Sequence, residues 1–286
     1  MTRPAGSFSI AVLGIALMLT PAFGVAGSHE SGEKGIPAPS DKDDWCDDTR
    51  QRDDEKVGYC EVREMRMAAG RKLAVDGGMN GGIAVKGSSQ KDVLVLTKVQ
   101  AWARSEEGAR ELADQVEIVA RDGTVRAKGP ETKGTGSWWS VSFRIYTPNA
   151  TDLDLEAHNG GITIDGVQGD IDFETMNGGV VLLRLAGDVN GHTTNGGLNV
   201  VLDGSRWQGA GLDVDTNNGS IHVVFPASYN AQLETGTTNG SVNVAFPGGY
   251  SGRNHGHFRG QVGKGGPPIR VVTTNGAVNI STDPGD

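Results

Sequence analysis

The feature that most constrains this sequence is an Asn-Gly dipeptide that recurs in the same context at six positions of its C-terminal half. The segments TTNGGLNVVL, TTNGSVNVAFP and TTNGAVNI show that context. The first two intervals are 18 residues, and the later ones are 23, 21 and 36 residues. Such self-similarity is typical of folds that stack one structural unit, with insertions in the longer repeats. The asparagines are Asn159, Asn177, Asn195, Asn218, Asn239 and Asn275.

Aliphatic residues stand at fixed distances from each asparagine. They occupy the third and fifth positions after it and the sixth before it, with a weaker column four positions before it. This period of two predicts two short strands per repeat, joined at Asn-Gly. We expect the dipeptide to supply positive φ angles, and the recurring threonines and asparagines to form hydrogen-bonded ladders. The third-position residues are Ile162, Val180, Leu198, Ile221, Val242 and Val278.

A single repeat is too small to fold alone. Burial of its aliphatic side chains contributes about 6–12 kcal/mol, whereas ordering its backbone costs on the order of 20–35 kcal/mol. Independent hairpins are therefore disfavoured, and stacking is favoured because each strand gains a neighbour on both sides. The sequence predicts an all-β fold, a β-solenoid of stacked Asn-Gly rungs about 4.8 Å apart around one interior.

The stretch before the repeats extends the same architecture. Asn80-Gly81-Gly82-Ile83 repeats the pattern, and strands are expected at 116–127 and 138–147. One short helix is predicted near 105–116, capped by Ser105, with one apolar face. That face comprises Ala109, Leu112, Ala113 and Val116. We expect the β-solenoid domain to span residues 61–282.

The N-terminus has the pattern of a signal peptide over residues 1–26. Arg3 supplies positive charge, Ile10 to Leu19 the apolar stretch, and FGVAG the small residues before cleavage after Ala26. A short membrane anchor is the weaker interpretation, because the apolar stretch is too short to span a bilayer. With no later apolar segment of sufficient length, we expect a soluble mature protein, either periplasmic or secreted to the bacterial cell surface.

Residues 27–60 are rich in charge, Pro, Gly and Ser, and we expect them to be loose except around a disulfide. Cys46 and Cys60 are the two cysteines of the chain, and an even count in an exported protein indicates a disulfide. Metal ligation is the alternative, but two cysteines without a nearby histidine make a poor zinc site.

The order of these features resembles a family of exported bacterial proteins. NGGIAV, the short helix, the segment RIYTPNATDLDLEAHNGGITIDGVQGDIDFETMNGG with its Thr147-Pro148 turn, and the repeated TTNG carry the resemblance. It covers about residues 60–282. Members have no established function and are commonly labelled adhesins of the β-repeat type. The resemblance implies an exported β-solenoid associated with the cell envelope, and it supplies no catalytic residues.

Charge defines one candidate surface. The formal net charge of −9, without a stripe of Lys and Arg, argues against a nucleic-acid partner. Alternating strand positions place an acidic column on one face, which we interpret as a solvated surface. The alternative is that its oxygens recruit calcium, the one cofactor that the pattern suggests. The column comprises Asp154, Glu156, Asp172, Glu174, Asn190, His192, Asp213, Asp215 and Glu234.

The insertions define a second candidate surface. Residues 203–210, 225–232 and 246–268 all follow the second strand of a repeat, so they should emerge along one edge, which is often the binding surface of a solenoid. The alternative is that their aromatic residues cap the core, with Phe225 and Phe246 as the leading candidates. The predicted ligand-binding residues are Arg206, Trp207, Tyr229, Tyr250, Arg253 and Phe258.

Two classes of function remain open at this point. The favoured one is a non-catalytic protein that binds envelope polysaccharide, peptidoglycan or a protein surface. The alternative is a parallel β-helix polysaccharide lyase or hydrolase, with carboxylates drawn from Asp165, Asp170 and Asp172. Two of these belong to the turn DGVQGD, where aspartate is common. His255 and His257 have no third ligand nearby and predict no metal site.

Overall fold

The computed structural model of the 286-residue chain describes residues 45–47, 56–134, 136–245, 251–254 and 256–283. The chain divides into two units, Met1–Lys34 and Gly35–Asp286, and every described residue belongs to the second. The predicted signal peptide and most of the segment 27–60 therefore lie outside the described residues. No helix among the described residues combines the length and the apolar character that crossing a membrane requires.

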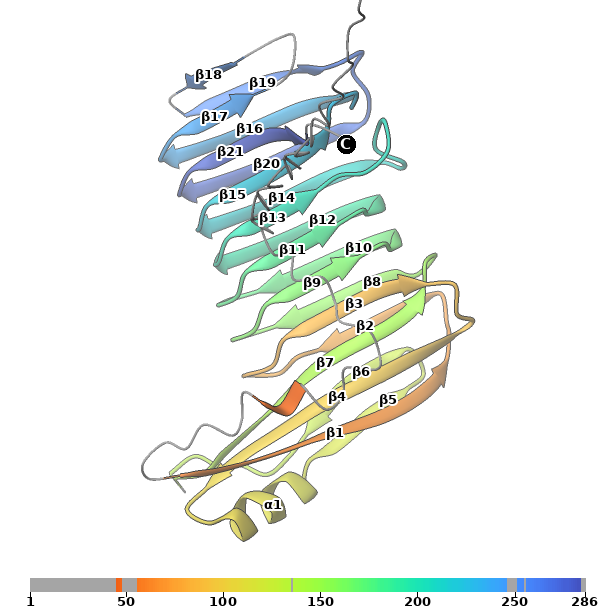
Figure 1. Ribbon diagram of the computed structural model, residues 1–286, viewed down its shortest axis with the longest axis vertical. Coiled ribbons are helices and arrows are strands. Elements are labelled where there is room, and N and C mark those ends of the chain that lie inside the picture. Colours follow the sequence, from red (N-terminus) through yellow and green to blue (C-terminus); the bar gives the residue numbers. More distant parts are fainter. Residues whose placement is uncertain (1–44, 48–55, 135, 246–250, 255, 284–286) are drawn as a thin grey trace, which may run out of the picture. The chain divides into compact units, whose positions relative to one another are not determined.

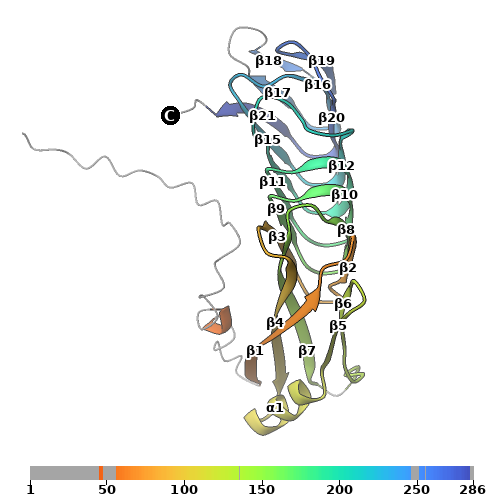
Figure 2. The same ribbon diagram turned by 90° about the vertical axis from the view of Figure 1, so that its right-hand side faces the viewer.

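The described residues form two large β-sheets around one apolar core (Figures 1 and 2). The predicted all-β fold with one short helix is confirmed for this part of the chain. In spatial order, the eleven-stranded sheet contains β1 (Val57–Ala68), β4 (Asp92–Ala103), β7 (Trp138–Pro148), β3 (Ile83–Ser88), β9 (Ile162–Asp165), β11 (Val180–Leu183), β13 (Leu198–Val201), β15 (Ile221–Pro226), β21 (Val278–Asp283), β17 (Val242–Ala245) and β18 (Ser251–Asn254). The ten-stranded sheet contains β19 (His257–Val262), β16 (Ala231–Asn239), β20 (Pro268–Asn275), β14 (Gly211–Asn218), β12 (Ala186–Asn195), β10 (Gln168–Thr175), β8 (Asp152–Ala157), β2 (Lys72–Asp76), β6 (Thr124–Lys128) and β5 (Glu117–Arg121).

Each Asn-Gly turn of the repeats leads from a strand of the ten-stranded sheet to a strand of the eleven-stranded sheet. We call such a pair of strands a level and name it by its asparagine. Val180 pairs in register with Ile162 on one side and Leu198 on the other, and all three are fully buried. These aliphatic positions therefore lie one above another in a shared interior.

The levels do not stack in chain order. The last level of the sequence, Asn275, lies between the levels of Asn218 and Asn239, because β20 pairs with β14 and β16, and β21 with β15 and β17. The Asn239 level is covered on its far side by β18 and β19, which run antiparallel to β17 and β16. Because β18 and β19 occupy the outer edge of the Asn239 level, β20 and β21 lie on its inner side, next to the Asn218 level.

The asparagine side chains form one hydrogen-bonded ladder. Each Nδ2 donates to the Oδ1 of the next asparagine at 2.7–3.1 Å. The ladder runs from Asn239 through Asn275, Asn218, Asn195, Asn177 and Asn159 to Asn80. The threonines form no such ladder. Thr175 and Thr193 donate instead to the backbone carbonyls of Gly160 and Gly178 on the neighbouring level, at 2.8 and 2.9 Å.

The glycine of each dipeptide is required by close approach to a neighbouring level, and five of the six have no positive φ. A Cβ on Gly178 would lie 2.1 Å from the carbonyl oxygen of Gly160, and a Cβ on Gly196 would lie 1.9 Å from that of Gly178. Of the six glycines that directly follow these asparagines, only Gly276 has a positive φ, at 156°. The expectation that Asn-Gly supplies positive φ angles is therefore wrong for the other five.

The opposite end of the stack begins with the Asn80 level. Its Ile83 pairs with Ile162. Beyond this level, β6 pairs in parallel with β2 in one sheet, and β7 pairs in parallel with β3 in the other. The antiparallel strands β5, β4 and β1 close this end. The predicted single strand at 116–127 is two strands, β5 and β6, because Asp122 and Gly123 form a tight turn with φ values of 52° and 73°.

Helix α1 (Glu106–Asp114) is slightly shorter than the predicted 105–116. Ser105 caps it as expected, with its side chain accepting a hydrogen bond from Gly108 N at 3.2 Å. Ala109, Leu112 and Ala113 are buried on one face. Val116 is also buried, but it lies beyond the end of the helix.

The predicted disulfide between Cys46 and Cys60 is present, with a Cα–Cα distance of 5.8 Å. It ties the short described segment 45–47 to β1. Trp45 packs on a second apolar cluster, apart from the main core, that contains Leu94, Leu96 and Tyr146. The Arg144 guanidinium lies 4.1 Å from the centroid of the Trp45 ring.

Candidate functional site

The outer face of the ten-stranded sheet carries the acidic column that the sequence predicts. Strand pairing places Asp154, Asp172, Asn190 and Asp213 side by side in one row. A second row contains Glu156, Glu174, His192 and Asp215. Because alternate residues of a strand point to opposite faces, both rows project away from the core.

The unexpected order of the levels changes this column at one end. Arg270 of β20 pairs with Asp213 on one side and Glu234 on the other, so a cation interrupts the row of carboxylates. Its Nη1 lies 2.5 Å from the Asp213 carboxylate. Arg259 of β19 donates to Glu234, at 3.0 Å from Nε, and this hydrogen bond is the main cause that lowers the pKa of Glu234.

Cations also flank the column at its other end. Lys72 Nζ lies 2.7 Å from the Asp154 carboxylate, and that hydrogen bond raises the pKa of Lys72. The pKa of Asp152 is lowered, first by a hydrogen bond from the backbone N–H of Asp170 and then by one from Arg71. Between these ends, no ion pair joins Asp172 or Glu174 to another described residue.

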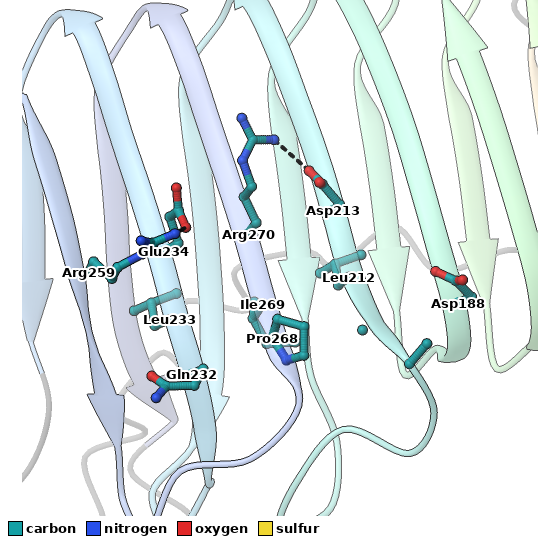
Figure 3. A pocket seen from close by; sticks show the side chains of 12 residues that line it. Asp188, Leu212, Asp213, Gln232, Leu233, Glu234, Arg259, Pro268, Ile269 and Arg270 are labelled. Atoms are coloured by element: carbon teal, nitrogen blue, oxygen red, sulfur yellow. Dashed lines mark hydrogen bonds and ion pairs between the residues drawn. The ribbon is translucent and has the colours of Figure 1, made fainter.

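Two adjoining hollows lie on this face. One has a volume of about 520 Å³ and spans β14, β20, β16 and β19 (Figure 3). In Figure 3 the Asp213–Arg270 pair and the Glu234–Arg259 pair lie on one side of the hollow, and Gln232 and Pro268 lie on the other. The second hollow, of about 450 Å³, lies over the two acidic rows. Both are lined by Asp213 and Arg270, so the hollows are neighbours.

The described residues provide no cluster of three or more His, Cys, Asp or Glu side chains arranged to hold a metal ion. Calcium binding on the acidic column therefore gains no support from the geometry. His192 Nδ1 instead lies 2.7 Å from an Asp215 carboxylate oxygen, and Arg270 pairs with Asp213.

Two of the predicted ligand-binding residues belong to the core. Trp207 is 3% exposed, and its Nε1 donates to the carbonyl of Gly187 at 2.9 Å. Tyr229 is 2% exposed and packs edge-to-face on Phe225, with 5.2 Å between ring centroids. Burial is the main cause that raises the pKa of Tyr229. The expectation that these two rings bind a ligand is corrected: they close the open edge of the core, as does Phe225.

The other predicted residues are dispersed. Arg206 is exposed, and Phe258 is half-buried against the core. Arg253 lies in β18, opposite Asn243. Tyr250, Phe246 and His255 lie outside the described residues. His257 Nε2 lies 3.5 Å from a Glu234 carboxylate oxygen.

Asn230 joins the insertions at this edge, and the sequence interpretation missed it. Its Nδ2 donates to the carbonyl of Ser205 at 3.0 Å, and its Oδ1 accepts from the backbone N–H of Lys264 at 2.7 Å. Arg206 also forms a parallel bridge with Asn230. A lone asparagine in a loop carries no pattern that would have marked it.

The carboxylates considered for an enzyme do not converge. Asp165, at the end of β9 in the eleven-stranded sheet, is 3% exposed and forms an ion pair with Arg184. Asp170 and Asp172 lie in β10 of the other sheet and project outward. Asp165 therefore pairs with a residue of the next level in one sheet, whereas the other two carboxylates lie on the outer face of the other sheet.

Comparison with known proteins gives a family and several structural neighbours. The model of the Toastrack DUF4097 family matches residues 80–281. A "putative cell adhesion protein" from Clostridium sporogenes shares 15% identity, with a TM-score of 0.36 over 78% of this chain and 100% of that one. A "putative adhesin" from Bacteroides fragilis shares 11% identity, with a TM-score of 0.33 over 78% of this chain and 97% of that one.

A "putative lipid binding protein" from Parabacteroides distasonis is also similar in structure. It shares 11% identity, with a TM-score of 0.25 over 78% of this chain and 96% of that one. No curated protein matches the sequence. The neighbours thus carry more than one functional label.

Proposed function

Because the chain belongs to the Toastrack DUF4097 family, we propose that it is an exported, non-catalytic β-solenoid of Asn-Gly rungs that binds a polymer of the cell envelope. The proposed ligand is a polysaccharide, free or within peptidoglycan, and the proposed location is the periplasm or the bacterial cell surface. The Cys46–Cys60 disulfide supports export, since disulfides persist in oxidising compartments.

The observation that carries this proposal is the pair of adjoining hollows on the outer face of the ten-stranded sheet. Neighbouring strands lie about 4.8 Å apart, so their outward side chains repeat at short, regular intervals. Carboxylates accept hydrogen bonds, and arginine and amide groups donate them. Such rows suit the repeated hydroxyl groups of a glycan chain.

Charge narrows the proposed ligand. The acidic rows repel polyanions, whereas a neutral or amino-bearing glycan meets no such repulsion. Arg270 pairs with Asp213 where the two hollows meet, and Arg259 adds a second cation, beside Glu234, at the larger hollow. The proposal therefore places the main contacts at that hollow and gives the remaining acidic rows a role in selectivity.

The test is retention of the mature protein on purified peptidoglycan and on an array of neutral, amino-bearing and anionic glycans. The variant is Asp213→Ala with Arg270→Ala, which removes the ion pair shared by both hollows. We expect binding to weaken about tenfold or more, equivalent to about 1.4 kcal/mol or more. The neutral and amino-bearing glycans should be the ones retained by the unmodified protein.

The matched control removes a similar exposed ion pair from the other sheet. Arg66 Nη1 and Asp92 Oδ2 lie 3.0 Å apart on β1 and β4, and their double alanine variant should bind normally. Retention that is unchanged in a folded Asp213/Arg270 variant, or reduced equally in the control, contradicts binding at these hollows. Circular dichroism verifies folding in each case.

A further inference from the structure

Side chains that can bind a metal ion occupy one position of the Asn-Gly edge on three consecutive levels. The residue before the asparagine is Met79 on the Asn80 level, His158 on the Asn159 level and Met176 on the Asn177 level. On the other four levels this position holds threonine or asparagine. The asparagine ladder shows that the three levels are immediate neighbours.

Backbone hydrogen bonds hold the three residues in register. Asn159 N donates to the carbonyl of Met79 at 3.0 Å, and Asn177 N donates to the carbonyl of His158 at 2.8 Å. Leu73 pairs with Leu153, but Asn80 comes seven residues after Leu73, whereas Asn159 comes six residues after Leu153. The Asn80 level therefore has one extra residue before its turn. Gly78, with a φ of 63°, lies in this longer connection, and Met79 still stands beside His158.

The two methionines are exposed, which apolar packing does not explain. Large apolar side chains that are strongly exposed in the described part of the chain are Met79 at 62%, Met176 at 45% and Trp138 at 37%. Beyond the predicted signal peptide the chain has four methionines, and Met65 and Met67 are partly buried in β1. The two exposed methionines are thus the pair that flanks His158.

The histidine is available between them. Ala157 and Thr175 are buried, so the alternation of strand residues turns His158 and Met176 outward. The His158 ring makes no hydrogen bond or ion pair with any other residue of the described ranges. Glu156 and Glu174 stand two residues earlier on the same face, and their negative charge attracts a cation.

We propose that Met79, His158 and Met176 form a binding site for Cu(I). Thioether sulfur is a soft ligand that selects Cu(I), and imidazole nitrogen also binds copper well. Adjacent levels are about 4.8 Å apart, and the flexible methionine side chains can bring both sulfurs to a metal beside the central imidazole. Neutral imidazole and thioether groups both coordinate a metal ion through a lone pair.

The test is an anaerobic competition of the mature protein with bicinchoninate for Cu(I). We expect one Cu(I) per chain at this site. Loss of a group that only hydrogen-bonds to a metal ligand already weakens metal binding about tenfold or more. Loss of a ligand itself should cost at least as much, so we expect this effect in each of Met79→Leu, Met176→Leu and His158→Gln. Leucine keeps the size and apolar character of methionine, so the fold should be retained.

Met65→Leu with Met67→Leu is the matched control and should leave the affinity unchanged. A second readout uses protein labelled with ¹³C at the methionine methyl groups and Ag(I), which needs no reductant. Ag(I) should shift the signals of Met79 and Met176 but not those of Met65 and Met67.

The proposal is overturned if the Met79→Leu/Met176→Leu double variant binds Cu(I) within twofold of the unmodified protein. It is also overturned if Ag(I) shifts no methionine signal or shifts all four equally. Zn(II), which does not favour thioethers, should lose no affinity in the methionine variants, and an equal loss for Zn(II) would contradict a soft-metal site.

Discussion

The two edges of the stack close the same core by different means. At the Asn-Gly edge, a ladder of amide side chains joins every turn to the next, and the glycines approach neighbouring carbonyls too closely to carry a Cβ. At the opposite edge the connections differ in length. There the core is closed by the buried rings of Trp207, Phe225 and Tyr229.

The difference shows what each kind of interaction demands of a sequence. A ladder needs the same donor and acceptor at the same position of every level, so it leaves a visible repeat. Closing a core by burial needs only apolar volume of suitable shape, so the type of residue at that edge can change from one level to the next. Three pairs of variants test this difference between the two edges.

The largest effect is expected at the edge closed by burial. Trp207→Ala leaves a cavity and removes the hydrogen bond to Gly187, so we expect the free energy of unfolding to fall by about 3–5 kcal/mol. Equilibrium unfolding in urea measures it. Arg206→Ala, which changes the exposed neighbour, should stay within about 0.5 kcal/mol. A loss below about 1 kcal/mol in Trp207→Ala would show that burial does not close this edge.

An intermediate effect is expected from two adjacent glycines of the ladder edge. A Cβ on Gly178 would lie 2.1 Å from the Gly160 carbonyl oxygen, whereas a Cβ on Gly179 would lie 3.7 Å from its nearest neighbour. Gly178→Ala should therefore lower the free energy of unfolding by about 1–3 kcal/mol. Gly179→Ala should lower it clearly less in the same urea titration. Equal losses would refute close approach as the reason for glycine in the dipeptide.

The smallest effect is expected from the amide ladder itself. Asn177→Ala removes one bond to Asn159 and one from Asn195, both at 2.8 Å on an exposed edge, and should cost about 1–2 kcal/mol. Asn199→Ala changes an exposed asparagine of β13 and serves as the reference. If thermal unfolding shifts equally in both variants, the ladder contributes nothing beyond an ordinary surface asparagine.

Local patterns were sufficient to predict much of the fold. The alternation around each asparagine marked the strands, Ser105 marked the start of the helix, and the two cysteines marked the disulfide. The single strand expected at 116–127 failed because one Asp-Gly pair, Asp122-Gly123, reverses the chain. Asp-Gly between alternating apolar residues is a strong signal for a hairpin turn, so the sequence carried this information and the interpretation missed it.

The candidate site was less predictable than the fold. The acidic rows followed from strand alternation, but the hollows depend on Arg270 and Arg259, which come from strands that lie out of chain order. Trp207 was expected at a ligand because aromatic residues with neighbouring arginines are frequent in binding loops. In the structure its ring lies beside Leu185, Leu202 and Leu212, and the composition of the insertion does not reveal that it folds back over the core.

The sequence alone determined the repeating unit of this protein: two alternating strands, an asparagine that bonds to its neighbours and a glycine beside it. The strands follow from local periodicity, and the asparagine and glycine follow from contacts that require the same residue on every level. The order of the levels, and therefore the places where opposite charges meet, became known only from the three-dimensional arrangement of the strands. Ile269 pairs as readily with Leu212 as with Leu233, so aliphatic columns cannot distinguish one neighbour from another. The strands that cover the outer edge of the Asn239 level leave the last level a place inside the stack.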